Sequence, residues 1–187
     1  MNRVVTIPNI ISVVRLALVP FFVWLVFIGE VGWAGVLLGV IGATDWIDGY
    51  LARRLDQVSE VGKFLDPLAD RLAVIVAVIV GLIEGILPGW FAWALIIREG
   101  AIGLGALWGW SRGVTRLDVR WLGKAATLGL YVSITLIYLG KGFEIDALTW
   151  LGYLTGIPGL VMYYIVGVQY FFDMREAIAA EAEAGGR

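Results

Sequence analysis

Long apolar runs constrain this chain more than any other feature. A helix that crosses a membrane needs roughly 20 mostly apolar residues. Six stretches approach or exceed that length: 10–28, 33–44 with a possible extension to 53, 68–83, 87–110, 121–140 and 147–172. The chain is also 60% hydrophobic, whereas soluble domains are nearer half. The sequence therefore predicts an all-α integral membrane protein with six transmembrane helices.

The predicted helices form one unit. The length of 187 residues suits a single domain, which we expect over 1–175, followed by a short cytoplasmic tail at 176–187. The first apolar run is longer than the ~7–15 residues of a signal-peptide core, and no small-residue cleavage site follows it. We therefore expect it to be a retained helix.

The basic residues are distributed unevenly between the connecting segments. The segment 53–71 and the segment 112–124 are rich in arginine and lysine, whereas the opposite loops contain only Lys141. Because basic loops stay on the cytoplasmic side, we expect both termini to lie in the cytoplasm, with the protein in the cell membrane. The same rule places the polar residues 45–70 at the cytoplasmic side, which is where we expect a polar active-site cavity.

Two missing residue types exclude several kinds of chemistry. The chain has no cysteine and no histidine, which excludes disulfides, thiolate or imidazole metal sites and a Ser–His–Asp relay. Carboxylates are then the leading candidates for acid–base work. The net charge of −2 argues against nucleic acid as a partner, because that function relies on a basic face.

Four aspartates stand between the second and third apolar runs. Asp45 and Asp48 are three residues apart, and Asp66 and Asp70 are four apart, so each pair shares one face of a helix. Four carboxylates brought together would repel one another. Hard oxygen ligands suit Mg²⁺ or Mn²⁺, and two such ions would balance four charges.

Each aspartate alone also has a structural interpretation. Asp66 precedes a proline and could cap a helix. Asp45 could pair with Arg53, and Asp70 could pair with Arg71 or Lys63. Ionisable residues at the border of a membrane span are nevertheless functional candidates by default. The four together favour a functional site.

Small residues and an arginine accompany the acids. Gly49, Ala52 and Gly62 leave bare helix surface beside them, and Arg53 presents a planar donor fork suited to phosphate. Glycine in membrane helices also serves packing, so only the combination is informative. It describes a diphosphate site.

Residues 45–70 resemble the signature of the CDP-alcohol phosphotransferases, D-x2-D-G-x2-A-R-x8-G-x3-D-x3-D, with every fixed position present. The resemblance implies that an acceptor hydroxyl attacks the β-phosphorus of CDP-diacylglycerol and releases CMP. It also implies a homodimer in contact with membrane lipids. By position it assigns Asp45, Asp48, Asp66 and Asp70 to the metal, Asp70 also to the general base, and Gly49, Ala52, Arg53, Ser59 and Gly62 to the CDP-lipid.

The acceptor is less constrained. The segments IPNIISVVRLALVP, REG and LGKAAT resemble the branch containing phosphatidylglycerophosphate synthase and cardiolipin synthase, whose acceptors are glycerol-3-phosphate and phosphatidylglycerol. We modestly favour glycerol-3-phosphate, because a glutamate follows Arg98. Candidates for the acceptor phosphate are Arg15, Arg98, Arg112 and Lys124, with Arg116 and Arg120 nearby. The alternatives are a structural Arg98–Glu99 pair and an interfacial belt for lipid headgroups.

Two other protein classes remain as alternatives. A divalent-cation or secondary transporter could also place aspartates at a span boundary, but inverted repeats would be expected. Here the four acids lie in one hairpin, without a counterpart in the second half. A structural scaffold would leave the carboxylates unexplained. A phosphatidyltransferase is the leading hypothesis.

Overall fold

The structure is a computed structural model that describes the backbone of residues 7–55, 60–112 and 121–185. Side chains are described for 13–44, 71–105, 107–112 and 121–178. Over these ranges the chain is helical, with short turns between the helices. The helices are α1 (Ile7–Phe27), α2 (Val31–Leu55), α3 (Glu60–Ile83), α4 (Gly89–Ser111), α5 (Trp121–Gly142) and α6 (Asp146–Gly185).

The helices follow the predicted apolar runs, with two extensions. Helix α3 begins at Glu60, earlier than the predicted Leu68, because it includes the polar residues of the signature. Helix α6 continues to Gly185, beyond the predicted Phe172. Its last turns are rich in alanine and glutamate, which are strong helix formers. The predicted all-α class is confirmed.

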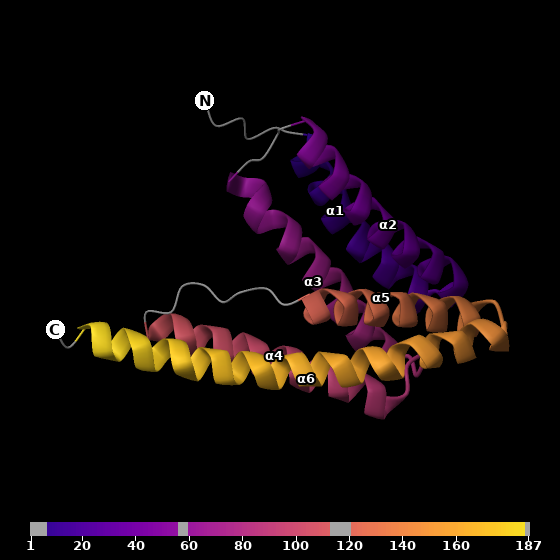
Figure 1. Cartoon of the computed structure of the whole chain (residues 1–187). Helices are drawn as coiled ribbons and strands as arrows, with labels where there is room; N and C mark the ends of the chain where they lie inside the picture. The colour runs from indigo at the N-terminus through magenta and orange to yellow at the C-terminus, as the bar shows by residue number, and fades with distance from the viewer. Residues whose placement is uncertain (1–6, 56–59, 113–120, 186–187) are drawn as a thin grey trace.

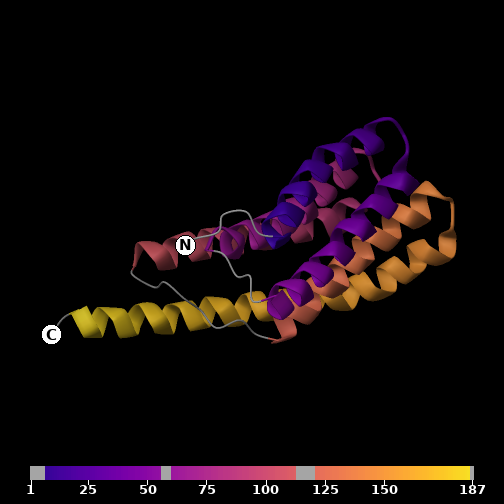
Figure 2. The ribbon, with the colours of Figure 1, turned by 90° about the horizontal axis from the view of Figure 1, so that it is seen from above.

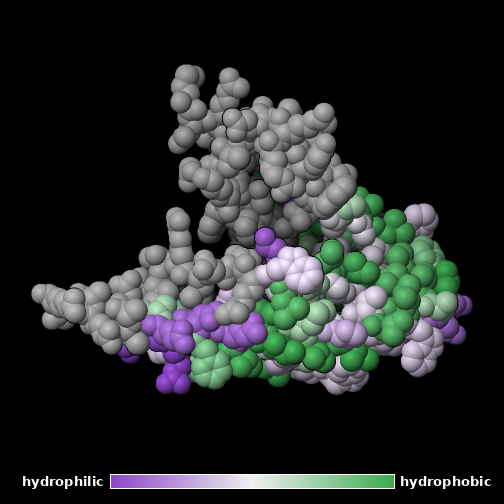
Figure 3. All heavy atoms as spheres, viewed as in Figure 1, coloured by the Kyte–Doolittle hydropathy of each residue, from purple (hydrophilic) through white to green (hydrophobic). Residues whose placement is uncertain are grey.

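Among the residues that the structure describes, three helices are long and apolar enough to cross a membrane: Gly89–Ser111, Trp121–Gly142 and Asp146–Ile178. Within the described side chains, the first three helices contribute shorter apolar segments, Val13–Phe27, Val31–Thr44 and Arg71–Ile83. Large apolar side chains also lie exposed, among them Leu104, Trp150 and Leu154, and hydrophobic residues cover much of the face seen in Figure 3. These features are those of a membrane protein. Six complete spans stay a prediction.

Helix α5 lies at the centre of the packing. It contacts α6 along most of its length and α2 over a shorter stretch, while α1 packs on both α2 and α3. Figures 1 and 2 show α5 and α6 as an antiparallel pair that crosses the α1–α2 pair. The α1–α2 and α5–α6 turns lie near each other at one end. The two chain termini lie away from that end.

Glycines bring the backbones of α2 and α5 together at the turn end. An added Cβ at Gly142 would collide with the backbone nitrogen of Gly32, and one at Gly35 would lie 2.8 Å from the backbone nitrogen of Leu139. Close approach of this kind maximises van der Waals contact between membrane helices. It also leaves no room for a side chain at either glycine.

The α5–α6 interface uses the same principle. Ser133 is fully buried and its hydroxyl donates to the carbonyl oxygen of Gly152 at 2.7 Å. An added Cβ at Gly156 would collide with the Ser133 hydroxyl. The buried hydroxyl is therefore both hydrogen-bonded and closely enclosed.

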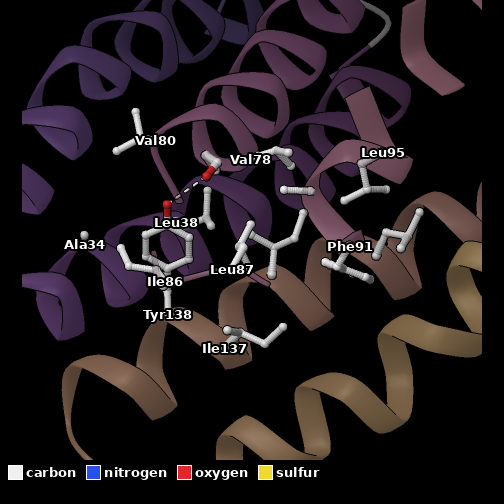
Figure 4. Close-up of a cluster of buried hydrophobic side chains, with 14 of the residues drawn as sticks. Ala34, Leu38, Val78, Val80, Ile86, Leu87, Phe91, Leu95, Ile137 and Tyr138 are labelled. Carbon is white, nitrogen blue, oxygen red and sulfur yellow. Dashed lines mark hydrogen bonds between the residues drawn. The ribbon is translucent and has the colours of Figure 1, made fainter. Parts of the chain in front are cut away.

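Two tyrosines of α5 bond to neighbouring helices. The Tyr131 hydroxyl donates to the carbonyl of Leu38 in α2 at 2.5 Å, and the Tyr138 hydroxyl donates to the carbonyl of Ala77 in α3 at 2.7 Å. Figure 4 shows Tyr138 among buried apolar side chains from α2, α3, α4 and α5. Polar side chains thus fix the relative positions of helices that apolar packing alone would leave free to slide.

Tight turns close the helices at this end. Gly29 and Gly85 follow α1 and α3 with φ of 86° and 67°, and Glu144 follows α5 with φ of 57°. The amide of Glu30 donates to the carbonyl of Leu25, and the amide of Ile145 donates to that of Gly140. These bonds satisfy carbonyls at the ends of the helices. Glu144 adopts the left-handed region without the freedom of glycine.

Candidate functional site

The backbone at the four aspartates is helical. Positions 45 and 48 lie in α2, and positions 66 and 70 lie in α3. The helical spacing on which the shared faces depend is therefore confirmed. The side chains of Asp45, Asp48, Asp66 and Asp70 lie outside the described residues, so their convergence stays a prediction.

The predicted CDP-lipid contacts lie on the same two helices. Gly49, Ala52 and Arg53 belong to the last turns of α2, and Gly62 belongs to the first turn of α3. Their side-chain surroundings, and Ser59 as a whole, lie outside the described residues. Residues 56–59 connect α2 to α3 in the sequence. The end of α2 and the start of α3 both lie at the end of the molecule where α1 begins (Figure 1).

Helix α1 lies against both α2 and α3, which contact each other little. Its Arg15 is only 2% exposed. The structure therefore places this arginine inside the protein, and its side chain does not extend to lipid headgroups. Contact between Arg15 and a ligand stays a prediction.

Arg98 occupies the middle of α4 and is 7% exposed. One terminal nitrogen of its guanidinium, Nη1, lies 3.0 Å from Oε1 of Glu99, which is partly buried. The predicted contact between these neighbours is confirmed. On the α6 side, the guanidinium carbon lies 3.2 Å from the centroid of the Tyr163 ring.

The other acceptor candidates are exposed. Arg112 ends α4, with its backbone amide donating to the carbonyls of Gly109 and Trp110, and Lys124 lies in the first turn of α5. Between them, Arg116 and Arg120 lie outside the described residues. Both exposed side chains are free to meet either a substrate or lipid headgroups.

Tyr163 is not among the site residues predicted from the sequence. It lies far from Arg98 along the chain, and the pairing of α4 with α6 is needed to bring them together. A signal was nevertheless present, since an arginine in the middle of a span requires polar or aromatic partners. Tyrosine rings are among the partners that can stabilise a cation inside a protein.

A family sequence profile matches most of this chain. The family described as CDP-alcohol phosphatidyltransferase matches residues 5–168. This range includes the whole aspartate signature and extends into α6.

Relatives with two different names are similar over long stretches. A cardiolipin synthase (CMP-forming) from Streptomyces coelicolor is 38% identical over 98% of this chain and 89% of its own. A Mycobacterium tuberculosis protein provisionally named as a cardiolipin synthase is 40% identical over 75% of this chain and 68% of its own. A CDP-diacylglycerol–glycerol-3-phosphate 3-phosphatidyltransferase from Escherichia coli is 30% identical over 93% of both chains.

Proposed function

Because the chain belongs to the CDP-alcohol phosphatidyltransferase family, and is thus a phosphatidyltransferase of the membrane, we propose that it transfers the phosphatidyl group of CDP-diacylglycerol to a phosphate-bearing glycerol alcohol. The observation that carries this proposal is the complete signature of residues 45–70 on two helices joined by 56–59. The products are CMP and a phosphodiester lipid.

A divalent metal is a general requirement of the family. The four aspartates fit a divalent ion, because the helical backbone places two carboxylates on one face of α2 and two on one face of α3. We propose Asp45, Asp48, Asp66 and Asp70 as ligands of two ions, Mg²⁺ or Mn²⁺. When bound, such ions stabilise negative charge on the phosphates and on departing CMP.

The transfer itself needs a base and alignment. The acceptor hydroxyl oxygen forms a bond to the β-phosphorus while the phosphoanhydride bond to CMP breaks. Asp70 takes the hydroxyl proton. We assign Gly49, Ala52, Arg53, Ser59 and Gly62 to the nucleotide and diphosphate. Because CMP is a good leaving group, positioning and charge neutralisation supply most of the catalysis.

We further propose that all six helices cross the cell membrane, with both termini and the active site on the cytoplasmic side. The arginine-rich segments support this orientation. So does the arrangement in which the α1–α2 and α5–α6 turns lie together, away from the termini (Figure 2). A homodimer stays a prediction from the family resemblance.

Phosphatidylglycerol is the acceptor that the relatives favour. Identity is higher to the Streptomyces cardiolipin synthase than to the Escherichia phosphatidyltransferase, with both comparisons covering more than 90% of this chain. Glycerol-3-phosphate is the second candidate, because the Arg98–Glu99 sequence resembles that subgroup and the Escherichia relative matches along its whole fold. Both acceptors offer a glycerol hydroxyl and a phosphate.

The decisive experiment measures CMP release by the purified full-length protein in mixed micelles with CDP-diacylglycerol and Mg²⁺ or Mn²⁺. Phosphatidylglycerol and glycerol-3-phosphate are supplied in parallel. Release with phosphatidylglycerol alone supports the first acceptor, and release with glycerol-3-phosphate alone supports the second. The absence of release with either would contradict the proposed function.

The metal ligands have a separate test that needs no turnover. Asp66→Ala should weaken metal-dependent binding of CDP-diacylglycerol by about tenfold or more, because a ligand mutation removes one charged contact. A titration of CDP-lipid binding at increasing Mn²⁺ measures this. Unchanged titration would remove Asp66 from the ligand set.

A further inference from the structure

The guanidinium group of Arg98 has an ion-pair partner for one of its nitrogens but no hydrogen-bond partner for another. Oε1 of Glu99 lies 3.0 Å from one terminal nitrogen of the guanidinium and forms an ion pair with it. The Nε atom is buried, and no hydrogen-bond partner for it is found among the residues that the structure describes. A buried donor without a partner has lost its hydration without gaining a hydrogen bond in exchange. An oxygen atom from a ligand would supply that bond.

Two consecutive tyrosines of α6 fix the position of this arginine. The ring of Tyr163 lies under the guanidinium, 3.2 Å from its central carbon. The hydroxyl of Tyr164 donates to the carbonyl of Ala94 at 2.7 Å, one turn before Arg98 in α4. One tyrosine therefore holds the side chain and the next holds the backbone of the helix that carries it.

Gly167 lies one turn after Tyr163 on the same face of α6. An added Cβ at Gly167 would lie 3.8 Å from Nε of Arg98 and 4.0 Å from Cδ1 of Ile102. A methyl group would fit at these distances, but a larger side chain would cover the Nε atom. Glycine at this position therefore places no side chain of α6 over the buried Nε donor.

The surroundings of Arg98 favour an anion. Arg71, which directly follows Asp70 in α3, lies close enough to act electrostatically on Arg98, as does Tyr170 of α6. A second arginine close to the first favours an anionic group at this point of the bundle. Arg71 is also adjacent in sequence to Asp70, the proposed base.

We infer that Tyr163 is a positioning residue that holds Arg98 for an oxyanion of the acceptor phosphate, and that Gly167 keeps side chains of α6 away from the buried Nε donor of Arg98. This inference rests on the proposed function. The ligand chemistry is a phosphate oxygen, whether it belongs to the phosphatidylglycerol headgroup or to glycerol-3-phosphate. Glu99 balances part of the arginine charge.

The kinetic test uses substitutions at the two α6 positions in the full-length protein. Tyr163→Leu removes the ring and Gly167→Leu covers Nε, so each should raise the acceptor KM about tenfold, while kcat and the KM for CDP-diacylglycerol change less than about twofold. Tyr163→Phe, which retains the ring face, should restore the acceptor KM. Gly167→Ala should have little effect.

A matched control comes from α4. Gly100 is exposed, and an added Cβ there would meet nothing within 4 Å, so Gly100→Leu adds the same side chain without approaching Arg98. Its acceptor KM should equal that of the unmodified protein. The inference is overturned if Gly167→Leu leaves the acceptor KM unchanged. It is also overturned if Tyr163→Leu alters the KM of both substrates equally, as a merely structural residue would.

A binding measurement separates this inference from the proposed function. Thermal unfolding is followed with and without short-chain phosphatidylglycerol, glycerol-3-phosphate or inorganic phosphate. At least one should raise Tm for the unmodified protein and for Tyr163→Phe, but not for Tyr163→Leu or Gly167→Leu. If CMP is never released but this pattern holds, the proposed function fails and the anion site stands. If no phosphate compound shifts Tm, the anion site fails.

Discussion

The turn end of the α2–α5 interface and the region around Arg98 in the α4–α6 interface are built from different kinds of residue. Between α2 and α5, Gly32, Gly35 and Gly142 let the backbones approach until an added Cβ would collide. Between α4 and α6, Arg98, Tyr163 and Tyr164 separate the helices with large polar or aromatic side chains. The first interface has no space for a ligand, and the second contains a donor without a described partner.

This difference indicates a division of labour within one bundle. Close backbone contact at the turn end gives a rigid frame, because many van der Waals contacts are lost if the helices shift. The α4–α6 interface depends on a few directional contacts, so it can be altered without loss of the fold. Substitutions at the first interface should change stability, and those near the charged residues should change activity.

The largest expected effect is on activity alone. Asp70→Asn removes the proposed base, and turnover should fall by about 10²–10⁴-fold, while CDP-diacylglycerol binding and Tm change little. CMP release and lipid titration measure the two effects. Asp146→Asn, in the first turn of α6, is the control and should leave turnover unchanged. Survival of activity within a few fold would refute the base assignment.

The next effect is on stability alone. Gly142→Val forces a side chain against the backbone of Gly32, and overpacking of this kind costs about 1–3 kcal/mol or more. Thermal unfolding in detergent should show a clearly lower Tm. Gly105→Val is the matched control, because an added Cβ at Gly105 meets nothing within 4 Å. Equal losses in both variants would contradict the close approach of α2 and α5.

A smaller effect is expected from one interhelical hydrogen bond. Tyr138→Phe removes the bond to the carbonyl of Ala77 and should lower stability by about 0.5–1.5 kcal/mol. The acceptor KM should not change, in contrast to Tyr163→Leu. Chemical denaturation and CMP kinetics on the same preparation give both values. A changed acceptor KM would show that this α3–α5 contact and the Arg98 region are not independent.

The smallest effect is a gain in stability at the turn end. Glu144 has φ of 57°, and glycine relieves the strain of this conformation at some entropic cost, so Glu144→Gly should stabilise by up to about 1 kcal/mol. Glu30→Gly, at a turn position without positive φ, should be neutral or destabilising. A higher Tm for Glu30→Gly than for Glu144→Gly would rule out the strain.

Much of the fold could be predicted from the sequence, because a membrane helix is defined by a local run of apolar residues. The start of α3 at Glu60 was missed for the same reason, since its first turns carry Gly62, Lys63 and Asp66. The aspartate positions were predictable because their spacing is local to two helices. The Arg98–Tyr163 contact was not, because it depends on which helices pack together.

The adjacency of Arg98 and Glu99 affects the insertion of α4 into a membrane. An arginine at the centre of a helix costs about 2.5–3.5 kcal/mol as that helix enters the bilayer. Since its counter-charge is the next residue of α4 and contacts it directly, the cation arrives already partnered. In the proposed six-span topology, helix α4 can therefore be inserted before α6, which carries Tyr163, has left the ribosome.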